Sequence, residues 1–285
     1  MITLFADNKE VPVNMIEFSD GAITFKLDKL PEAPKYISIN VCPSTPVYRV
    51  REEILMISSC IFERDFPNNV KLYLNLPYMP YGRCDRVFEE GNPNGLKSFL
   101  FTLEHIGGFD EINVYDLHNE VAVRNIINEY NLDLVVKNTS QKDCLHQSLP
   151  CDLDNTYDMI LAPDKGSVTK AAEIACHYEV DVYNCGKERD VATGKIIRST
   201  LPEGVDFADK IVLIPDDLCD GGYTFIKLAE QVKAAGAKQV DLYVTHLIAS
   251  KGLDVFGGLI DNIYCRQTVG DYVNKQNLLD FNSNK

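Results

Sequence analysis

Three closely spaced carboxylates follow a short apolar segment of this chain, residues 211–215, and precede the helical pattern of residues 225–235. The backbone N–H groups and the dipole at a helix N-terminus favour a phosphate group, and carboxylates bind ribose hydroxyls or a metal ion. The intervening loop is therefore predicted to bind a phosphorylated sugar, and its candidate residues are Asp216, Asp217, Asp220, Gly221, Gly222, Tyr223 and Thr224. The alternative is a plain acidic turn in which Asp220 lies near the helix cap.

Two further polar side chains follow predicted strands. His118 comes after the strand pattern of residues 112–117, and Asp164 comes after that of residues 157–162. In open α/β sheets, ligands bind beyond the carboxyl ends of the strands. The pair is therefore a candidate Mg²⁺ site in which water and phosphate oxygens supply most of the ligands. Each residue taken alone also fits a strand-end cap.

A first cationic segment follows the strand predicted over residues 70–76. Residues 81–86 read Tyr-Gly-Arg-Cys-Asp-Arg, and two arginines in such a loop can hold a polyphosphate through paired hydrogen bonds. The alternative is a surface salt-bridge cluster with Glu89 and Glu90.

A second cationic segment lies in the polar stretch 184–200, which contains Lys187, Arg189 and two glycines. A mobile loop that closes over a transferring phosphoryl group is one interpretation. A solvated hairpin is the other.

Strands alternate with helices of about ten residues along the chain, which is typical of βαβ units and a parallel sheet. A faint repeat supports two related halves, because Gly108 and His118 are separated by the same interval as Gly236 and His246. The helices predicted ahead of these glycines fit helices that end in glycine. The predicted fold class is α/β.

Composition excludes several classes of function. The 285 residues are 45% hydrophobic and carry a net charge of −14, so non-specific binding to nucleic acid or an anionic membrane is not expected. The nine cysteines are scattered and include no C-x-x-C pair, which is typical of free thiols in a reducing cytoplasm. Neither a signal peptide nor a membrane span is expected.

In their order along the chain, these segments resemble the ribose-phosphate pyrophosphokinase (PRPP synthetase) family. The resemblance covers an opening strand (4–6), an adenine-contacting loop (18–21), an ATP-binding segment (77–86), two metal-site motifs (116–118 and 163–164), a Lys-x-Arg catalytic loop (187–189) and a ribose 5-phosphate loop (216–224). It implies two tandem type I phosphoribosyltransferase-like domains, 1–145 and 146–285, each a mostly parallel sheet flanked by helices. The last residues are candidates to pack back on the first domain.

The resemblance also implies a reaction, in which the 1-hydroxyl of a ribose 5-phosphate unit attacks the β-phosphorus of MgATP and AMP leaves. The implied roles are ATP binding by Phe18, Asp20, Arg83, Cys84, Asp85 and His118, Mg²⁺ binding by His118 and Asp164, stabilisation of the migrating diphosphate by Lys187 and Arg189, and ribose phosphate binding by the seven loop residues named above. A homo-oligomer, dimer or hexamer, is implied as well.

Departures from the family pattern bear on the acceptor. Gly221 replaces the first threonine of the usual phosphate loop, and Tyr223 replaces its second glycine. Such a loop leaves room beyond the 5′-phosphate, and the tyrosine ring can stack on a base. Some phage relatives are ADP-ribose pyrophosphokinases that serve NAD resynthesis, and this chain resembles them. ADP-ribose and ribose 5-phosphate both stay open as acceptors, with ADP-ribose slightly favoured.

Two rival functions use the same features. A phosphoribosyltransferase binds PRPP with the same loop but usually needs only one such half and no ATP segment. A catalytically silent regulatory subunit would not need Lys187, Arg189, His118, Asp164 and all three loop aspartates.

Overall fold

The computed structural model describes residues 2–64, 69–149, 156–189 and 196–283. The chain divides into two compact units, Met1–Thr139 and Ser140–Lys285. This division falls slightly before the boundary expected at 145/146, because helix α4 (Gln141–His146) packs against elements of the second unit.

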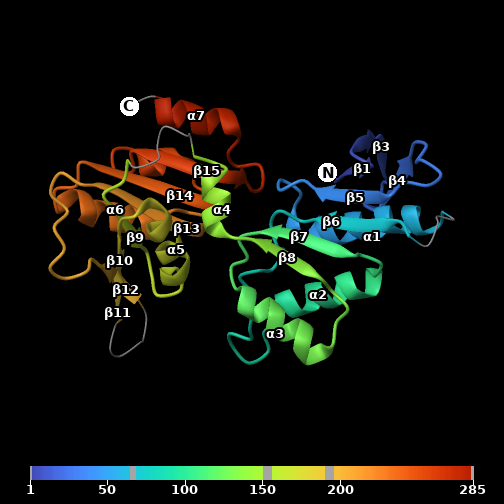
Figure 1. Ribbon diagram of the computed structural model, residues 1–285, viewed down its shortest axis with the longest axis horizontal. Coiled ribbons are helices and arrows are strands. Elements are labelled where there is room, and N and C mark those ends of the chain that lie inside the picture. The colour runs from blue at the N-terminus through green and yellow to red at the C-terminus, as the bar shows by residue number, and fades with distance from the viewer. Residues whose placement is uncertain (1, 65–68, 150–155, 190–195, 284–285) are drawn as a thin grey trace. The chain divides into compact units, whose positions relative to one another are not determined.

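The first unit is built on a six-stranded sheet with the order β2-β1-β5-β6-β7-β8. The strands β5 to β8 pair in parallel, whereas β1 and β2 add antiparallel at one edge (Figure 1). The bounds of these strands are β1 Ile2–Ala6, β2 Lys9–Val11, β5 Tyr36–Val41, β6 Lys71–Asn75, β7 Glu111–Tyr115 and β8 Val136–Thr139. The helices of the unit are α1 Val47–Phe62, α2 Gly95–Ile106 and α3 Glu120–Tyr130.

Alternating side chains fix which face of this sheet is buried. Along β5 the residues Ile37, Ile39 and Val41 are buried, while the residues between them stay partly exposed. The buried set forms one core with apolar residues of α1 such as Ile54 and Ile57. Each such side chain stabilises the fold by roughly 1.5–3 kcal/mol when it leaves water. The helices therefore hold one face of the sheet tightly.

A separate antiparallel hairpin precedes β5, formed by β3 (Val13–Glu17) and β4 (Ile23–Leu27). In its turn the Phe18 N–H donates to the Ala22 carbonyl and the Gly21 N–H donates to the Phe18 carbonyl. The Asp20 carboxylate accepts from the Ala22 N–H at 3.0 Å.

The second unit is built on a five-stranded parallel sheet with the order β10-β9-β13-β14-β15. Its strands are β9 Met159–Ala162, β10 Asp181–Asn184, β13 Ile211–Cys219, β14 Gln239–Leu247 and β15 Asn262–Thr268, and its longer helices are α5 Val168–Tyr178, α6 Tyr223–Ala234 and α7 Lys275–Ser283. A short 3₁₀ helix, η2, spans Asp254–Phe256. Helix α7, at the end of the chain, packs against β15 of its own unit.

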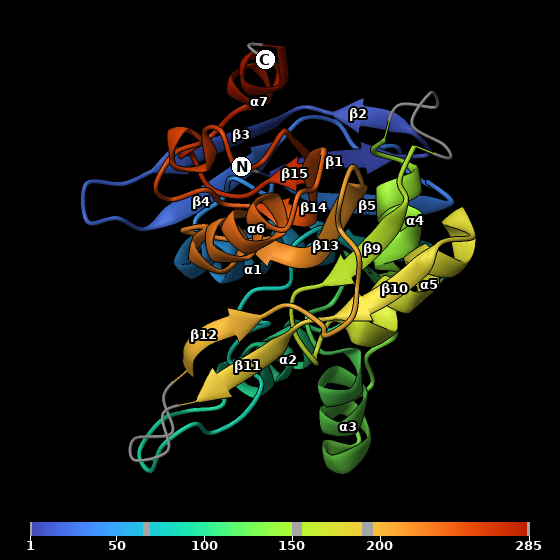
Figure 2. The same ribbon diagram turned by 90° about the vertical axis from the view of Figure 1, so that its left-hand side faces the viewer.

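A two-stranded antiparallel ribbon, β11 (Gly186–Arg189) and β12 (Ile196–Thr200), stands apart from this sheet (Figure 2). Gly186 is needed where the ribbon begins, because a Cβ there would lie 2.4 Å from Thr200 Oγ1.

The predicted α/β class is confirmed, and the elements expected from periodicity are present. Two strands are longer than predicted. The strand expected over residues 240–244 is β14, Gln239–Leu247, and the other is β13. The strand expected to end at residue 215 continues to Cys219, and helix α6 begins at Tyr223. The phosphate-loop residues are therefore the end of a strand, a turn of three residues and the start of a helix, because β13 stays paired with β14 as far as Cys219.

Eight of the nine cysteines lie among the described residues, and these eight are free thiols, while Cys151 lies outside the description. In the described part of the chain, no helix is both long and apolar enough to cross a membrane.

Candidate functional site

The end of β13 holds two adjacent carboxylates in the interior of the second unit. The N–H of Asp217 donates to Asp216 Oδ1 at 2.8 Å, and Asp217 is almost wholly buried. Part of Asp216 stays exposed, but the protein atoms around it withdraw its carboxylate from water. This burial, followed by the charge of Asp217, holds the pKa of Asp216 well above its ordinary value. A bound cation, or hydroxyl groups that donate hydrogen bonds to the two carboxylates, would stabilise such a pair.

Asp164 lies in the turn between β9 and α5. Its Oδ1 accepts from the N–H groups of Gly166 at 2.8 Å and Ser167 at 3.1 Å, as expected of a strand-end cap. The same carboxylate contributes to the raised pKa of Asp216, after the larger effects of burial and Asp217. It also adds to burial in raising the pKa of the Cys185 thiol to about 12. The structure therefore brings Asp164 within electrostatic range of the carboxylates of β13.

The turn from β13 to α6 leaves the start of that helix open. Gly222 has a φ of 77° and precedes the helix without any side-chain cap, so the first N–H groups of α6 can serve a ligand. The Asp220 carboxylate accepts from Ser250 Oγ and therefore does not cap the helix. A Cβ on Gly222 would lie 2.4 Å from the Phe256 ring, so this position requires glycine.

The remaining residues of the predicted loop face outward. The Tyr223 side chain is 71% exposed, and Thr224 is exposed as well. Gly221 has an ordinary φ, and a Cβ there would meet only Lys251 Cγ, at 3.7 Å. The space above Gly221 is therefore open enough for a side chain or for part of a ligand.

In the first unit, the segment expected to bind ATP forms a tight turn against the start of α2. Tyr81 has a φ of 60°, and its carbonyl accepts from the N–H of Cys84 at 2.8 Å. Arg83 and Cys84 are exposed, and Arg83 makes no ion pair with any described residue. The alternative of a cluster with Glu89 and Glu90 is therefore not what forms. Arg86 instead pairs with Asp85 at 3.3 Å and stacks over the Phe88 ring.

Asp85 is held in place by the turn that follows β7. The Asn119 side chain donates to Asp85 Oδ2 at 2.6 Å, and Asp85 is buried. His118 is exposed in that same turn, and its Cβ would lie 3.9 Å from a Cβ on Gly82. The ATP-segment turn and the turn that carries His118 are thus neighbours.

The other predicted residues lie farther out or outside the description. Phe18, 52% exposed, and Asp20 lie in the β3–β4 turn, where Asp20 stabilises the hairpin itself. The backbone of Lys187 and Arg189 belongs to β11, so the hairpin interpretation fits, while the side chains of residues 187–199 lie outside the description.

Comparison with known proteins shows what this chain is similar to. A phosphoribosyl transferase domain model matches residues 143–266. The ribose-phosphate pyrophosphokinase of Pyrococcus abyssi is 27% identical over 91% of this chain and 89% of its own length, and that of Campylobacter jejuni is 26% identical over 88% and 77%. A phosphoribosylpyrophosphate synthetase from Mycobacterium smegmatis has the same fold, with a TM-score of 0.71 at 19% identity over 89% of this chain and 79% of that one. Along most of its length the chain is thus similar to ribose-phosphate pyrophosphokinases, and it shares the fold of a phosphoribosylpyrophosphate synthetase.

Within this family resemblance, Ser250 and Lys251 are residues that sequence reasoning missed. They follow β14, and they contact the phosphate-loop segment at Asp220 and Gly221. The rule that polar residues beyond strand ends form the site would have found them, had it been applied to the strand predicted over 240–244. Asn119, the partner of Asp85, follows β7 and could have been found in the same way.

The described residues contain no cluster of three or more His, Cys, Asp or Glu side chains arranged to hold a metal ion. A site that relies on few protein ligands, with water and phosphate oxygens as the rest, is the arrangement that Mg²⁺ prefers at nucleotide sites.

Proposed function

We propose that this protein transfers the β,γ-diphosphate of ATP to the 1-hydroxyl of a ribose 5-phosphate unit and releases AMP. One observation carries the proposal: two adjacent carboxylates near the end of β13, Asp217 buried and Asp216 partly exposed, precede the uncapped start of α6. Carboxylates that share a site accept ribose hydroxyls, and the open N–H groups of a helix accept the 5′-phosphate. The named relatives with ribose-phosphate pyrophosphokinase activity support the same conclusion.

The proposed role of each residue follows from its charge. Asp216 and Asp217 orient the ribose so that its 1-hydroxyl faces the β-phosphorus, and the turn 220–224 holds the 5′-phosphate. Arg83, free of any ion pair among the described residues, binds ATP phosphates, and Asp85 fixes the turn that carries it. By resemblance, Lys187 and Arg189 stabilise negative charge on the migrating diphosphate. Positioning and charge stabilisation supply most of the rate enhancement in such a transfer.

Magnesium fits the donor set on its chemistry. Burial raises the pKa of Asp216, and the charges of Asp217 and Asp164 add to this effect. A divalent cation bound nearby would offset the charge of these carboxylates. We propose Asp164 and His118 as protein ligands or water-mediated contacts of Mg²⁺ bound with ATP phosphates. The bound ion would neutralise phosphate charge and so make the β-phosphorus easier to attack.

We propose ADP-ribose as the preferred acceptor. The 5′-phosphate of this molecule continues into a second phosphate and an adenosine, and the loop is open where these groups would pass. Among the described residues, a Cβ on Gly221 would meet only Lys251 within 4 Å, and the exposed Tyr223 ring can stack on a base. A lysine beside the opening suits a second phosphate, and a stacked ring contributes roughly 1–3 kcal/mol in nucleic-acid complexes.

The acceptor is tested by AMP release from ATP with ADP-ribose or ribose 5-phosphate, in the wild type and in Gly221→Thr. The expected result is a higher kcat/KM for ADP-ribose in the wild type and a shift towards ribose 5-phosphate in the variant, because the added side chain fills the opening and supplies a hydroxyl. Faster turnover of ribose 5-phosphate by the wild type would reject ADP-ribose and leave the transfer reaction standing.

A phosphoribosyltransferase is the second candidate, since the matched domain model is of that class. It predicts that the protein consumes PRPP and a base without ATP. Assembly into a homo-oligomer stays a prediction of the family resemblance, and residence in the cytoplasm stays a prediction from the scattered cysteines.

A further inference from the structure

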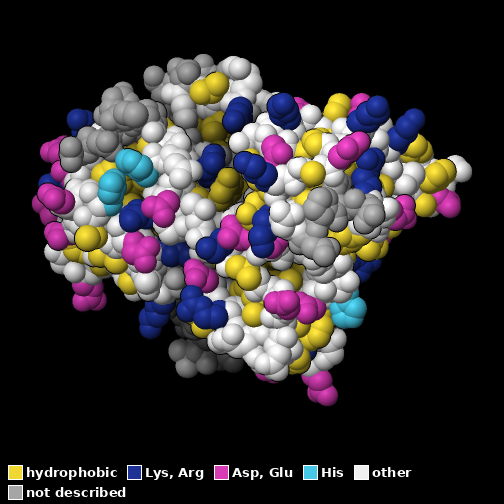
Figure 3. Space-filling model, turned by 45° about the vertical axis from the view of Figure 1, so that its right-hand side comes forward, with side chains coloured by type: hydrophobic (Ala, Val, Ile, Leu, Met, Phe, Trp, Pro, Cys, Tyr) yellow, Lys and Arg dark blue, Asp and Glu magenta, His cyan; other side chains and the backbone are white. Residues whose placement is uncertain are grey.

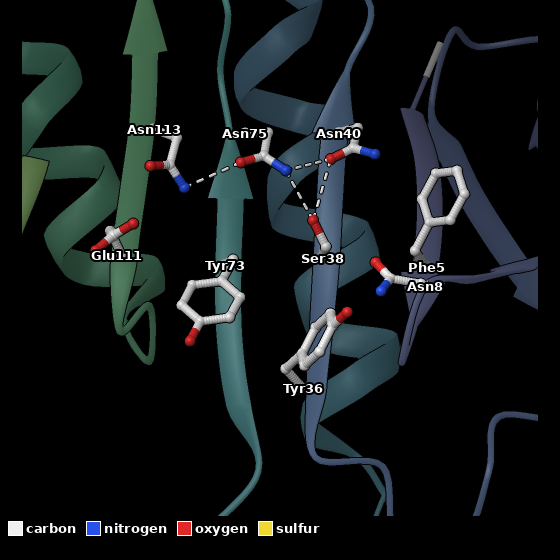
Figure 4. A pocket seen from close by; sticks show the side chains of 9 residues that line it. All are labelled: Phe5, Asn8, Tyr36, Ser38, Asn40, Tyr73, Asn75, Glu111 and Asn113. Carbon is white, nitrogen blue, oxygen red and sulfur yellow. Dashed lines mark hydrogen bonds between the residues drawn. The ribbon is translucent and has the colours of Figure 1, made fainter. Parts of the chain in front are cut away.

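One face of the first unit's sheet carries a polar hollow. On β5, β6 and β7 the apolar residues turn to the helix-covered side, and the alternate residues line a cavity of about 450 Å³ on the other side (Figure 4). Parallel sheets are usually covered on both faces and are apolar on both. The lining residues are Phe5, Asn8, Tyr36, Ser38, Asn40, Tyr73, Asn75, Glu111 and Asn113. None of the residues proposed to bind ATP is among them.

Three asparagines form a row across the floor of the hollow. Asn40, Asn75 and Asn113 are direct neighbours in the register of β5, β6 and β7. Asn113 donates to Asn75 at 3.0 Å, and Asn75 donates to Asn40 and to Ser38, the latter at 2.7 Å. Among the described residues, Nδ2 of Asn40 and Oδ1 of Asn113 have no hydrogen-bond partner. The row therefore offers a donor at one end and an acceptor at the other, two strand spacings or about 10 Å apart.

Aromatic rings complete the walls. Tyr36 and Tyr73 lie beside the row with ring centroids 5.9 Å apart and an interplanar angle of 56°, and Phe5 lines the hollow on the β1 side (Figure 4). Rings of this kind pack against flat or ring-shaped ligands, and their hydroxyl groups add hydrogen bonds. A cavity of this size falls in the range of small-molecule sites, which combine apolar walls with a few converging polar groups.

Charge and shape narrow the ligand class. Glu111 is the one charged residue among the nine, and it already lies 3.5 Å from Lys137. With no lysine or arginine in the lining, the hollow does not suit a phosphate group. Its concave form does not suit a second copy of the same face either, because two facing hollows would leave a void between the partners.

From these observations we infer that the hollow binds an uncharged hydroxylated ring, such as the ribose of a nucleoside or a free sugar. The row of asparagines forms hydrogen bonds with hydroxyl groups or with polar groups of a base. The tyrosines pack against the ring, and the Glu111 carboxylate accepts hydrogen bonds from vicinal hydroxyls. This site lies wholly in the first unit and is separate from the residues that carry the proposed transfer reaction.

The test is calorimetric titration of the full chain with ribose and, separately, with adenosine. The expected result is binding that falls at least tenfold in Asn75→Leu and in the milder Tyr73→Phe, yet persists in Arg83→Ala and Asp216→Asn. Tyr48→Ala, on an exposed position of α1, is the matched surface control and should bind as the wild type does. Binding of adenosine alone identifies a nucleoside as the source of the ring, and binding of both identifies the sugar.

Other outcomes overturn the inference. Absence of binding for both probes at millimolar concentration would do so. Adenosine binding that survives Asn75→Leu and is lost in Arg83→Ala would assign it to the ATP-binding turn. A wild type that sediments as a dimer beside a monomeric Asn75→Leu would assign this face to a second copy of the chain. Continued AMP release by Asn75→Leu shows in each case that the variant is folded and that the proposed reaction is unaffected.

Discussion

The two units end corresponding strands in different ways. In the first unit, β7 stops at Tyr115, Asp116 adopts a φ of 43°, and His118 is exposed in the turn. In the second unit, β14 runs on to Leu247, so His246 lies inside the strand at 2% exposure and contacts Gln267 at 2.9 Å. The same interval from glycine to histidine therefore yields an accessible side chain in one unit and a core side chain in the other.

The difference extends to the charged groups. Early strand ends in the first unit place Arg83 and His118 in exposed turns, where their charges need little support from the fold. The longer β13 of the second unit draws Asp216 and Asp217 into the interior, where burial raises the pKa of Asp216. We infer that the first unit offers accessible groups to a polyphosphate at little loss of stability. By the same inference, burial of these carboxylates lowers the stability of the second unit, and in the proposed reaction they bind a cation and a sugar.

The largest effect on activity is expected from a change in the carboxylates of the second unit. Asp216→Asn should lower kcat/KM for AMP release by roughly 10²–10³-fold, because it removes a charge that acts on the bound ribose and metal. Steady-state kinetics with both acceptors measure this loss.

Asp241→Asn is the matched control, since Asp241 is a fully buried carboxylate of β14 that accepts from Tyr157, Gln239 and Asn262. It should keep activity and lose about 1–3 kcal/mol of folding free energy, because an amide donor replaces an acceptor in that network. Equal loss of activity in the two variants would mean that the effect of Asp216 is structural.

The next largest effect concerns the turn that opens the start of α6. Gly222→Ala should reduce the free energy of unfolding by about 2–4 kcal/mol, because the new methyl group would strike the Phe256 ring and the residue has a positive φ. Chemical denaturation measures the change.

Two other glycines separate the causes. Gly258→Ala has a similar φ of 77° and nothing within 4 Å, so it should lose only about 1 kcal/mol. Gly221 has neither a positive φ nor a close neighbour, so Gly221→Ala should leave stability nearly unchanged. If all three variants behaved alike, the close contact with Phe256 would have no importance.

A smaller effect is expected in the exposed turn of the first unit. Arg83→Ala should raise the KM for ATP by roughly 10–100-fold, as expected for loss of a phosphate-binding arginine, and should leave the unfolding temperature unchanged because Arg83 has no ion pair among the described residues. Arg86→Ala is the control, since that arginine is already engaged with Asp85 and Phe88. An equal or larger rise in the KM for ATP in the Arg86 variant would mean that Arg86, and not Arg83 alone, binds the ATP phosphates.

The smallest effect is the pH dependence that the raised pKa of Asp216 implies. A carboxyl group whose pKa is higher in the folded than in the unfolded protein favours folding at low pH, and that contribution is lost as the pH rises through the folded-state pKa. Asp216→Asn should therefore unfold a few degrees above the wild type at neutral pH, by about 2–4 °C per kcal/mol, with a smaller difference near pH 4. Thermal melts across this range, without metal or nucleotide, test the sign. A variant less stable than the wild type at neutral pH would contradict it.

The sequence predicted the alternation of strands and helices because core burial and periodicity are local properties of each segment. That residues after β6, β7, β9 and β13 carry the site stays a prediction, which rests on the rule that ligands bind beyond the carboxyl ends of parallel strands. The sequence did not predict where each strand ends. Whether Asp216 lies in a strand or a loop depends on pairing with β14, and whether His246 is exposed depends on β15 at its side. Those are contacts between distant segments, which a local pattern does not contain.

The central claim is tested most directly by the products formed from ATP. The protein is incubated with Mg²⁺, ATP and ADP-ribose or ribose 5-phosphate, and both the nucleotide and the sugar product are weighed by mass spectrometry. The account predicts AMP together with an equal amount of a sugar that has gained a diphosphate group, and roughly 10²–10³-fold slower formation of both products by Asp216→Asn. Release of ADP instead of AMP, or an unchanged sugar with both acceptors, would contradict it.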